Sequence, residues 1–252
     1  MDKVAIIIPA RYGSKRLPGK PLLRLGNKPI IQHVYENASA SKHADRVIVA
    51  TDDRRIEEAV RSFGGECRMT PGNIKSGSDR IAYVAKDIDS GIIMNLQGDE
   101  PFLKPSLFDR GLELAQTHKD IPVVTLAARI KSIDELDNPN NVKVVVDKQG
   151  FALYFSRFPI PFTRDDKGKL VKRLGGHYRH IGIYIFRREA LLEFVRMKQS
   201  LLEKMEMLEQ LRLLENGYKI MVAVTGNPPA GIDTASDLKR AKAFLMKERK
   251  VL

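Results

Sequence analysis

A short apolar segment that runs directly into a basic loop sets the first limit on the fold of this chain. Residues 4–8 form an unbroken apolar run, V-A-I-I-I, which predicts a strand buried on both faces of a sheet. We expect Pro9 to end this strand, because proline has no N–H to donate to a sheet ladder. The loop that follows then lies at the carboxyl end of a buried strand, where ligands collect in open α/β sheets.

This loop combines cationic side chains with glycine and serine. The residues are Arg11, Lys15, Arg16 and Lys20, together with Gly13, Ser14 and Gly19. Cationic groups and backbone N–H groups can converge there on one polyanion, and a triphosphate is the natural ligand for such a loop. The alternative interpretation is a basic loop that is merely solvated.

Two familiar phosphate-binding motifs are absent from this loop. A P-loop has the spacing G-x-x-x-x-G-K-[ST]. Here five residues separate Gly13 from Gly19, and Lys20 is followed by Pro21, which has neither a hydroxyl nor an N–H. The dinucleotide fingerprint G-x-G-x-x-G is also missing, which removes the main argument for a nicotinamide or flavin site.

Strand and helix patterns alternate in the first part of the chain. Apolar residues at helical spacing predict a helix over 29–38, and residues 46–51 predict the next strand. A second helix over 56–63 is expected to be capped by Asp52 or Asp53. This alternation predicts an α/β fold with a mostly parallel, Rossmann-like sheet flanked by helices.

The later part of the chain departs from this alternation. Residues 142–147 and 151–156 are two β-type runs joined by a short glycine-containing connection, which indicates a hairpin. Residues 177–186 return to strand-like composition. We therefore expect one domain over residues 1–252, with a smaller β-rich lobe at about 140–190. Two further elements are predicted, a helix over residues 201–214 and a strand over residues 219–224.

A third predicted strand, over residues 91–96, leads into a second polar turn. Gly98 allows another backbone to approach closely, and Asp99 places a carboxylate where the sheet ends. A carboxylate at that point can bind a hard metal ion beside phosphate groups. The alternative interpretation of Asp99 is an Asx-type turn.

The loop over residues 70–80 also faces the expected ligand edge. Ser78 or Asp79 is expected to cap the helix that follows. The serine hydroxyls and Arg80 are then candidates for contact with a nucleotide.

Charge and cysteine content limit the remaining function classes. Lys and Arg number 43 against 31 Asp and Glu, a formal net charge of +12 that favours anionic ligands. The basic residues are spread along the chain without a nucleic-acid recognition motif, so a nucleic-acid-binding protein is the weaker interpretation.

Cys67 is the only cysteine, which excludes an internal disulfide and a cysteine-rich metal site. Without an apolar run of about 18 residues or a leader pattern, we expect a cytoplasmic protein and no membrane insertion.

Six segments of the chain are similar to the sugar-activating cytidylyltransferases, and most closely to those that act on 3-deoxy-D-manno-octulosonate (Kdo). The segments are I-P-A-R-Y-G-S-K-R-L-P-G-K-P-L at residues 8–22, N-L-Q-G-D-E-P at 95–101, A-L-Y-F-S-R at 152–157, Y-R-H-I-G-I-Y at 178–184, E-M-L-E-Q-L-R at 206–212 and G-I-D-T at 231–234. They follow the family's order through almost the whole chain. The chain departs from the family's H-x-S-G-T-D-R segment, because it lacks the histidine and has Ser78 for threonine.

The resemblance implies that the anomeric hydroxyl of Kdo attacks the α-phosphorus of CTP, giving CMP-Kdo and pyrophosphate. It implies Mg²⁺ as the cofactor, with Asp99 and Asp233 as its ligands. The catalytic residues are then Arg11, Lys20, Asp99 and Asp233. The nucleotide-binding residues are Pro9, Ala10, Arg11, Ser14, Lys15, Arg16, Lys20, Ser76, Ser78 and Arg80.

For the sugar, the resemblance implies contacts from Gln97, Arg157, His180, Tyr184, Glu209 and Gln210. Arg157 suits the sugar carboxylate, whereas the other side chains suit hydroxyl groups. The family also implies a homodimer built with the β-rich lobe, and a role in lipopolysaccharide biosynthesis. The alternative substrate is another acidic sugar, such as a sialic acid or 8-amino-Kdo. From the residues alone, the favoured interpretations are a core histidine for His180 and an exposed helix charge for Glu209.

Overall fold

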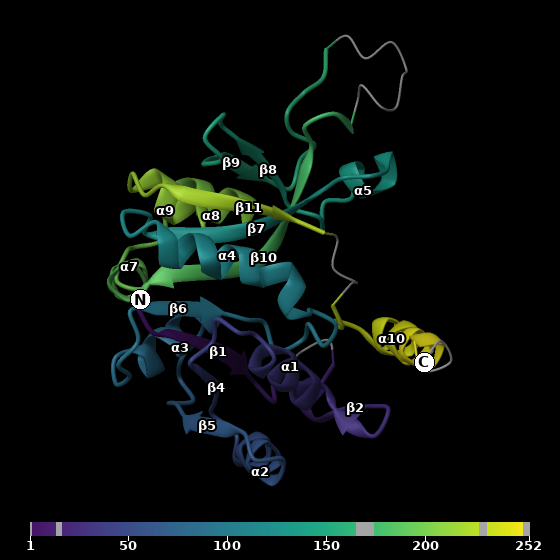
Figure 1. Ribbon diagram of the computed structural model, residues 1–252. Coiled ribbons are helices and arrows are strands. Elements are labelled where there is room, and N and C mark those ends of the chain that lie inside the picture. The colour runs from purple at the N-terminus through teal and green to yellow at the C-terminus, as the bar shows by residue number, and fades with distance from the viewer. Residues whose placement is uncertain (1, 14–16, 165–173, 227–230, 249–252) are drawn as a thin grey trace. The chain divides into compact units, whose positions relative to one another are not determined.

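The computed structural model describes residues 2–13, 17–164, 174–226 and 231–248. The chain divides into two compact units (Figure 1). Unit 1 contains Met1–Asp109 and Pro228–Leu252, and unit 2 contains Arg110–Asn227. Unit 1 is therefore built from both ends of the chain, and unit 2 is continuous in sequence.

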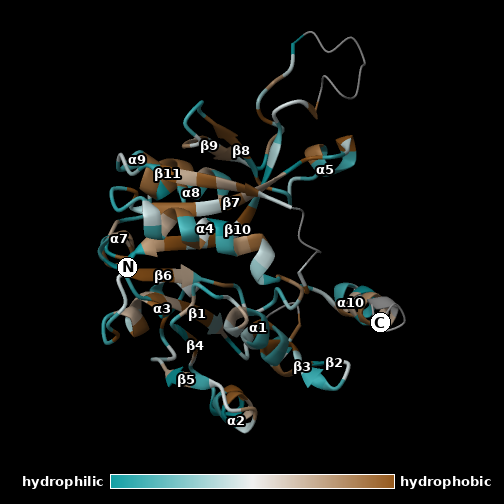
Figure 2. Cartoon of the chain, viewed as in Figure 1, coloured by the Kyte–Doolittle hydropathy of each residue, from teal (hydrophilic) through white to brown (hydrophobic). Residues whose placement is uncertain are grey.

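Unit 1 contains a parallel sheet with the strand order β6-β1-β4-β5. The strands are β1 (Val4–Ala10), β4 (Arg46–Thr51), β5 (Glu66–Met69) and β6 (Ile92–Asn95). Residues 4–8 and 92–95 are buried, as expected for strands covered on both faces. Figure 2 shows the apolar character of β1 and β6 against more polar outer segments. The predicted strands over 46–51 and 91–96 are confirmed within a residue or two.

The prediction that Pro9 ends the first strand is wrong. β1 continues to Ala10, and both residues pair with β4. The Leu96 N–H donates to the Ile7 carbonyl oxygen at 3.1 Å, so the polar backbone groups of Ile7 face β6. The nitrogen of Pro9, two residues later, lies on the same side of the strand. Pairing between β1 and β6 has already ended at Ile7. The missing N–H of Pro9 therefore falls where the ladder needs no donor.

Three helices pack against the strands of the unit 1 sheet: α1 (Ile30–Ser39), α2 (Arg54–Ser62) and α3 (Gly77–Ala85). Unit 1 also contains η1 (Lys20–Leu22, a 3-10 turn), and β2 (Arg24–Leu25), which pairs with β3 (Lys28–Pro29) in a separate hairpin. The last helix, α10 (Ala235–Glu248), contacts β2 of this hairpin. Asp53 caps α2 by accepting from Arg55 N, as predicted. The cap predicted for α3 is wrong: Ser76, and neither Ser78 nor Asp79, precedes the helix and accepts from Asp79 N. The sheet and its helices confirm the predicted α/β class.

Unit 2 contains a mixed sheet in which β11-β7-β10 are neighbours and β8 pairs with β10 and β9. The strands are β7 (Val123–Arg129), β8 (Lys143–Val146), β9 (Ala152–Ser156), β10 (Tyr178–Arg187) and β11 (Ile220–Thr225). β11 runs parallel to β7, and the other pairs are antiparallel. The antiparallel pairing of β8 and β9 confirms the predicted hairpin.

The boundary between the two units in the sequence falls within helix α4 (Pro105–Thr117). The helices that belong wholly to unit 2 are α5 (Ile133–Asp137), α7 (Arg188–Phe194), α8 (Leu201–Glu206) and α9 (Leu211–Glu215).

The single helix predicted over residues 201–214 is two helices, α8 and α9. A capping box between Ser200 and Glu203 begins α8. Met207 ends it with a left-handed backbone, φ 55° and ψ 46°. An apolar pattern at helical spacing continues through Met207, which is why periodicity alone did not predict the break. In the described part of the chain, no helix has the length and apolarity needed to span a bilayer.

Candidate active site

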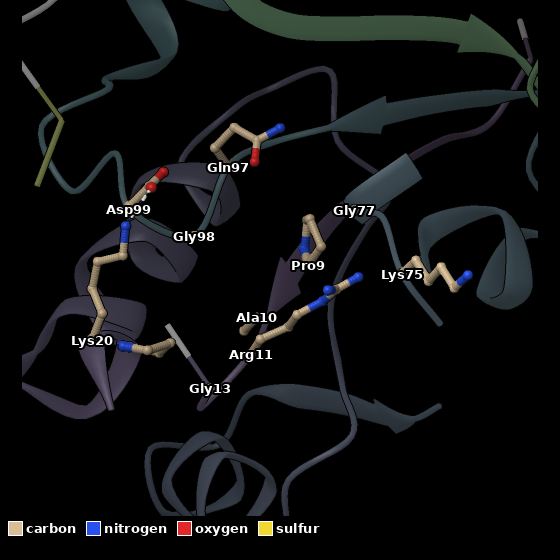
Figure 3. A pocket seen from close by; sticks show the side chains of 11 residues that line it. Pro9, Ala10, Arg11, Gly13, Lys20, Lys75, Gly77, Gln97, Gly98 and Asp99 are labelled. Carbon is tan, nitrogen blue, oxygen red and sulfur yellow. Dashed lines mark hydrogen bonds and ion pairs between the residues drawn. The ribbon is translucent and has the colours of Figure 1, made fainter. Parts of the chain in front are cut away.

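A cavity of about 320 Å³ lies in unit 1, at the carboxyl ends of β1 and β6 (Figure 3). Its lining residues are Pro9, Ala10, Arg11, Gly13, Lys20, Pro21, Lys75, Gly77, Gln97, Gly98 and Asp99. The cavity thus brings together segments that are distant in sequence but follow neighbouring parallel strands. Six of the side chains predicted to act on substrates or metal border it.

Gly98 permits the close approach of the two strand ends. A Cβ atom at this position would lie 3.0 Å from the carbonyl oxygen of Pro9, closer than real Cβ contacts to backbone normally come. Glycine removes that conflict, so the turn after β6 can pack against the end of β1. Gln97 and Asp99 consequently line the same cavity as Pro9 and Arg11.

Lys20 joins the two carboxylates that the sequence predicted as metal ligands. Its Nζ lies 2.7 Å from Asp99 Oδ2 and 2.9 Å from Asp233 Oδ1. The side chain of Lys20 is 13% exposed, against 31% for Asp99 and 45% for Asp233. A largely buried ammonium therefore sits between two carboxylates that keep access to solvent.

Burial and charge act in opposite directions on Lys20. Burial alone would lower the pKa of its ammonium, but the carboxylate of Asp99, followed by that of Asp233, outweighs burial, and the pKa is raised above its ordinary value. Lys20 is therefore a full cation at neutral pH.

Backbone contacts hold the segment of Asp233 against that of Asp99. The Ile232 N–H donates to the Asp99 carbonyl oxygen at 2.9 Å. A Cβ at Gly231 would lie 2.8 Å from Glu100 Oε1 and 3.3 Å from the Asp99 carbonyl oxygen, so a side chain there would force the Glu100 carboxylate to shift and would crowd the Asp99 backbone. The start of the last helix is thereby fixed at the cavity edge.

Asp237 fixes the turn that carries Asp233. Its carboxylate accepts from the backbone nitrogens of Asp233 and Thr234, and Thr234 Oγ1 accepts from Asp237 N. This reciprocal arrangement resembles a capping box, because it satisfies the Asp237 N–H in the first turn of α10 and the N–H groups of the two residues before the helix.

The chemistry of the two carboxylates fits Mg²⁺. Both direct an oxygen at one shared cation, and Mg²⁺ prefers a few carboxylate oxygens completed by phosphate oxygens and water. Within the described residues, no group of three His, Cys, Asp or Glu side chains is arranged to hold a metal. A metal at Asp99 and Asp233 would thus take its remaining ligands from substrate and solvent.

Arg11 supplies a second cation at the cavity. Its Nη2 is buried and has no hydrogen-bond partner among the described residues. Burial, and then the charge of Arg80, lower the pKa of the Arg11 guanidinium. A buried donor left without an acceptor costs about 1–3 kcal/mol, a cost that an anion in the cavity would remove.

Several predicted nucleotide-binding residues lie away from the cavity lining. Arg80 is fully buried and binds the Asp52 carboxylate at 2.9 Å and the Thr70 hydroxyl. Ser78 is 2% exposed, and the Ser76 hydroxyl is engaged in capping α3. Tertiary packing places these side chains in or beneath α3.

Three predicted residues, Ser14, Lys15 and Arg16, lie outside the described residues. The structure adds Lys75, a lining residue that sequence reasoning missed. The available signal was a lysine in the loop before α3, directly before the capping serine.

The other predicted sugar residues lie in unit 2. His180 is 9% exposed, and its Nε2 is 2.8 Å from the Thr125 hydroxyl. Its ring packs against those of Phe155 and Tyr184, with centroid distances of 5.0 and 5.4 Å. Burial, followed by the charge of Arg179, lowers the His180 pKa to about 3, so the ring is neutral at physiological pH.

Tyr184 connects His180 to the segment before α9. Burial and the Glu209 carboxylate raise the pKa of the Tyr184 hydroxyl, which is therefore protonated. Next to Glu209, Gln210 is 3% exposed, and its Nε2 has no hydrogen-bond partner in the described part of the chain. Four predicted sugar residues are thus neighbours in space or in sequence.

Arg157 binds backbone carbonyl oxygens. Its guanidinium donates to Glu206 at 2.8 Å, Pro139 at 3.1 Å and Met207 at 3.4 Å. The Glu206 carboxylate in return accepts from Ser156 Oγ and Arg157 N. Arg157 therefore stabilises the end of α8, just before Glu209 and Gln210.

Comparison with known proteins agrees with this geometry. The family model described as Cytidylyltransferase matches residues 5–220. The 3-deoxy-manno-octulosonate cytidylyltransferase of Thermodesulfovibrio yellowstonii is 50% identical over 247 residues, covering 95% of this chain and 96% of the relative. The protein of the same name from Geobacter metallireducens is 47% identical over 244 residues, covering 94% and 96%. A solved structure of CMP:2-keto-3-deoxy-manno-octonic acid synthetase complexed with CTP matches with a TM-score of 0.92 at 42% identity, covering 98% of this chain and 99% of the other.

Proposed function

Since the chain belongs to the cytidylyltransferase family, we propose that it transfers CMP from CTP to Kdo, giving CMP-Kdo and pyrophosphate. The observation that carries this proposal is that Lys20, which lines the cavity at the strand ends with Asp99, contacts the carboxylates of both Asp99 and Asp233. The whole-length similarity to enzymes named for Kdo selects the sugar. CMP-Kdo supplies lipopolysaccharide biosynthesis. We infer that the two units act as one nucleotidyltransferase domain in the cytoplasm.

CTP is bound in this proposal at the cavity of unit 1. Arg11 offers a buried donor that has no acceptor among the described residues, and Lys20 offers an ammonium that remains charged. Both suit the phosphate oxygens of a triphosphate, because hydrogen bonds between charged partners are stronger than neutral ones. Pro9, Ala10 and Gly98 supply backbone walls against the nucleotide.

The chain's residues align the reactants and offset charge without forming a covalent enzyme intermediate. Asp99 and Asp233 would hold Mg²⁺, which neutralises phosphate charge and favours ionisation of the attacking sugar hydroxyl. Lys20 and Arg11 hold phosphate oxygens while the bond between the α-phosphorus and the bridging oxygen breaks. Transfers of this kind depend mainly on positioning and electrostatic stabilisation.

The polar groups of unit 2 suit the hydroxyl groups of Kdo. His180 is neutral, so it exchanges hydrogen bonds without charge, and Gln210 has a buried amide donor that lacks a partner in the described residues. Glu209 and Tyr184 add an acceptor and a hydroxyl. Arg157 is the candidate for the sugar carboxylate, because its guanidinium carries five N–H donors and its three backbone contacts use one donor on each nitrogen.

Homodimerisation is part of the proposal and rests on exposed apolar side chains in unit 2. Leu153, Phe158 and Phe162 are largely exposed in or after β9, and Leu201 and Met205 are exposed one helical turn apart on α8. β9 pairs only with β8 among the described strands, so its other edge is open. Exposed apolar residues and an open edge are typical of association surfaces. A monomeric mass by light scattering would contradict this part of the proposal.

A pyrophosphate-release assay tests the function. The purified protein is supplied with Mg²⁺, with CTP or UTP, and with Kdo, 8-amino-Kdo or a sialic acid in turn. We expect the highest kcat/KM with CTP and Kdo. Faster turnover of another acidic sugar would support the alternative substrate, and release from no pair would contradict the enzyme.

A further inference from the structure

We propose that Lys20 is an internal competitor for the cation site formed by Asp99 and Asp233. This inference rests on the proposed function, because it concerns how metal enters the same site. The ammonium and a divalent ion cannot occupy that site together. Metal binding would therefore require Lys20 to move away, and a nucleotide phosphate would supply the anion that receives it.

The first support is the geometry of the contacts. One ammonium lies 2.7 Å from Asp99 Oδ2 and 2.9 Å from Asp233 Oδ1. Mg²⁺ binds oxygens at about 2.0–2.1 Å and would need the same carboxylates. The carboxylate oxygens therefore converge on one cation position, which Lys20 fills.

The second support is that the carboxylates have other anchors. The segment of Asp99 is tied to that of Asp233 by the hydrogen bond from Ile232 N to the Asp99 carbonyl oxygen. The turn at Asp233 is bound by the Asp237 carboxylate. The side chain of Lys20, by contrast, is a flexible four-carbon stem that can turn without moving backbone. Departure of the lysine thus leaves the metal ligands in place.

The third support is the location of Lys20 on the cavity wall. The same side chain that bridges the carboxylates also lines the 320 Å³ cavity, as Figure 3 shows for its approach to Asp99. A triphosphate in that cavity presents oxygens within the range of the stem. The lysine then exchanges two carboxylates for phosphate, and the vacated carboxylates accept the metal.

The exchange makes metal and nucleotide binding cooperative. A metal ion that binds without nucleotide must displace Lys20 from Asp99 and Asp233. When nucleotide is bound, Lys20 already contacts a phosphate group and the carboxylates are available to the metal. By linkage, each ligand then raises the affinity for the other by the same factor. Removal of the Lys20 charge should strengthen binding of metal alone and weaken this coupling.

Mn²⁺ binding provides a test that does not depend on turnover. The free Mn²⁺ signal in electron paramagnetic resonance gives Kd without nucleotide for the wild type, Lys20→Met and Lys75→Met. Lys75 lines the same cavity but lies away from Asp99 in Figure 3, so Lys75→Met controls for loss of one positive charge. We expect Lys20→Met to bind Mn²⁺ roughly tenfold more tightly, a change of about 1.4 kcal/mol, and Lys75→Met to differ from wild type by less than about threefold.

Two results of these titrations without nucleotide would overturn the inference. One is a Lys20→Met affinity equal to or weaker than wild type, with circular dichroism confirming the fold. The other is an equal gain in Lys75→Met, which would indicate only a general field effect. A second measurement repeats the Mn²⁺ titrations in the presence of CTP. The Mn²⁺ Kd without CTP, divided by the Mn²⁺ Kd with CTP, should be smaller in Lys20→Met than in wild type. An unchanged ratio would contradict the exchange. Absence of turnover with CTP and Kdo would contradict the proposed function but leave the Mn²⁺ result without nucleotide intact, so the two failures are distinguishable.

Discussion

Acidification should destabilise the protein through His180 well before the ring itself is protonated in the native state. The side chain is buried against Phe155 and Tyr184, and its pKa falls from 6.5 to about 3. In the unfolded chain the same imidazole titrates near its ordinary value. Between those two pKa values the unfolded state binds more protons, so stability rises with pH across this window and is lost as pH falls.

The size of the loss follows from the width of the window. Each pH unit below the pKa of the unfolded state lowers the free energy of unfolding by about 1.4 kcal/mol. His180 should therefore lower the free energy of unfolding by about 2.7 kcal/mol between pH 6.5 and 4.5. Urea unfolding at pH 7.5 and 4.5 measures the total change in wild type. His180→Gln offers an amide to Thr125 without a titrating group, and it should lose less stability on acidification by about that amount.

The reasoning would be refuted by equal losses in wild type and His180→Gln. Nuclear magnetic resonance of the histidine rings gives an independent measurement if the variant folds poorly. The chain has five histidines, and the His180 signals should not shift down to pH 4.5. A titration midpoint near 6.5 for that ring would show that burial does not hold it neutral.

Three further predictions concern the proposed site. Asp99→Asn and Asp233→Asn should each lose most activity and need more Mg²⁺, and the double variant should be little worse than the poorer single one, because we propose that the two residues hold one ion. Magnesium titrations test this, and additive losses with an unchanged Mg²⁺ requirement would contradict it. Lys20→Ala should lower kcat/KM by roughly tenfold to a hundredfold through loss of a charge-assisted contact of about 1.5–3 kcal/mol, with circular dichroism unchanged; near-native kcat/KM would exclude the role. Arg157→Ala should raise the KM for Kdo more than that for CTP, because its guanidinium and the end of α8 lie in unit 2 with His180, Tyr184, Glu209 and Gln210; equal changes in both KM values would assign it to packing alone.

Local signals predicted much of the secondary structure. The strand at 46–51 has the observed bounds, and α1 buries Ile30, Ile31 and Val34 as its spacing indicated. Asp53 caps α2 because its short side chain reaches the first free N–H groups of a helix, which is a property of the local sequence. Such features depend on few neighbours and are therefore visible in the sequence.

Features set by tertiary neighbours were not predictable in this way. Pro9 stays in its strand because the pairing with β6 has already ended, and no local signal records that. Met207 takes a left-handed conformation without being glycine or asparagine. Lys143, within a predicted strand, is fully buried with its ammonium 2.7 Å from the Asn141 carbonyl oxygen, and burial lowers its pKa.

The candidate site also combines features set by local sequence with features set by tertiary packing. The positions of the basic loop and of the turn at Asp99 were predictable, because each directly follows a predicted strand. The proximity of Asp99 to Asp233 was inferred from family resemblance and the expected sheet edge. Arg80 appeared equivalent to the other cations of the site in sequence. Its burial beside Asp52 and Thr70 depends on how α3 packs, which spacing does not encode.

The division of unit 1 between the two ends of the chain has a consequence for biosynthesis. Residues 1–109 leave the ribosome early, but Asp233 and its anchor to Asp99 belong to the part made last. Unit 2, which is continuous, is synthesised entirely in between. A nascent chain can therefore complete unit 2 while Lys20 and Asp99 still lack their third partner. Enzyme activity should appear only after the final segment has been released and has returned to the first, so premature termination anywhere before residue 233 yields a protein without the carboxylate pair.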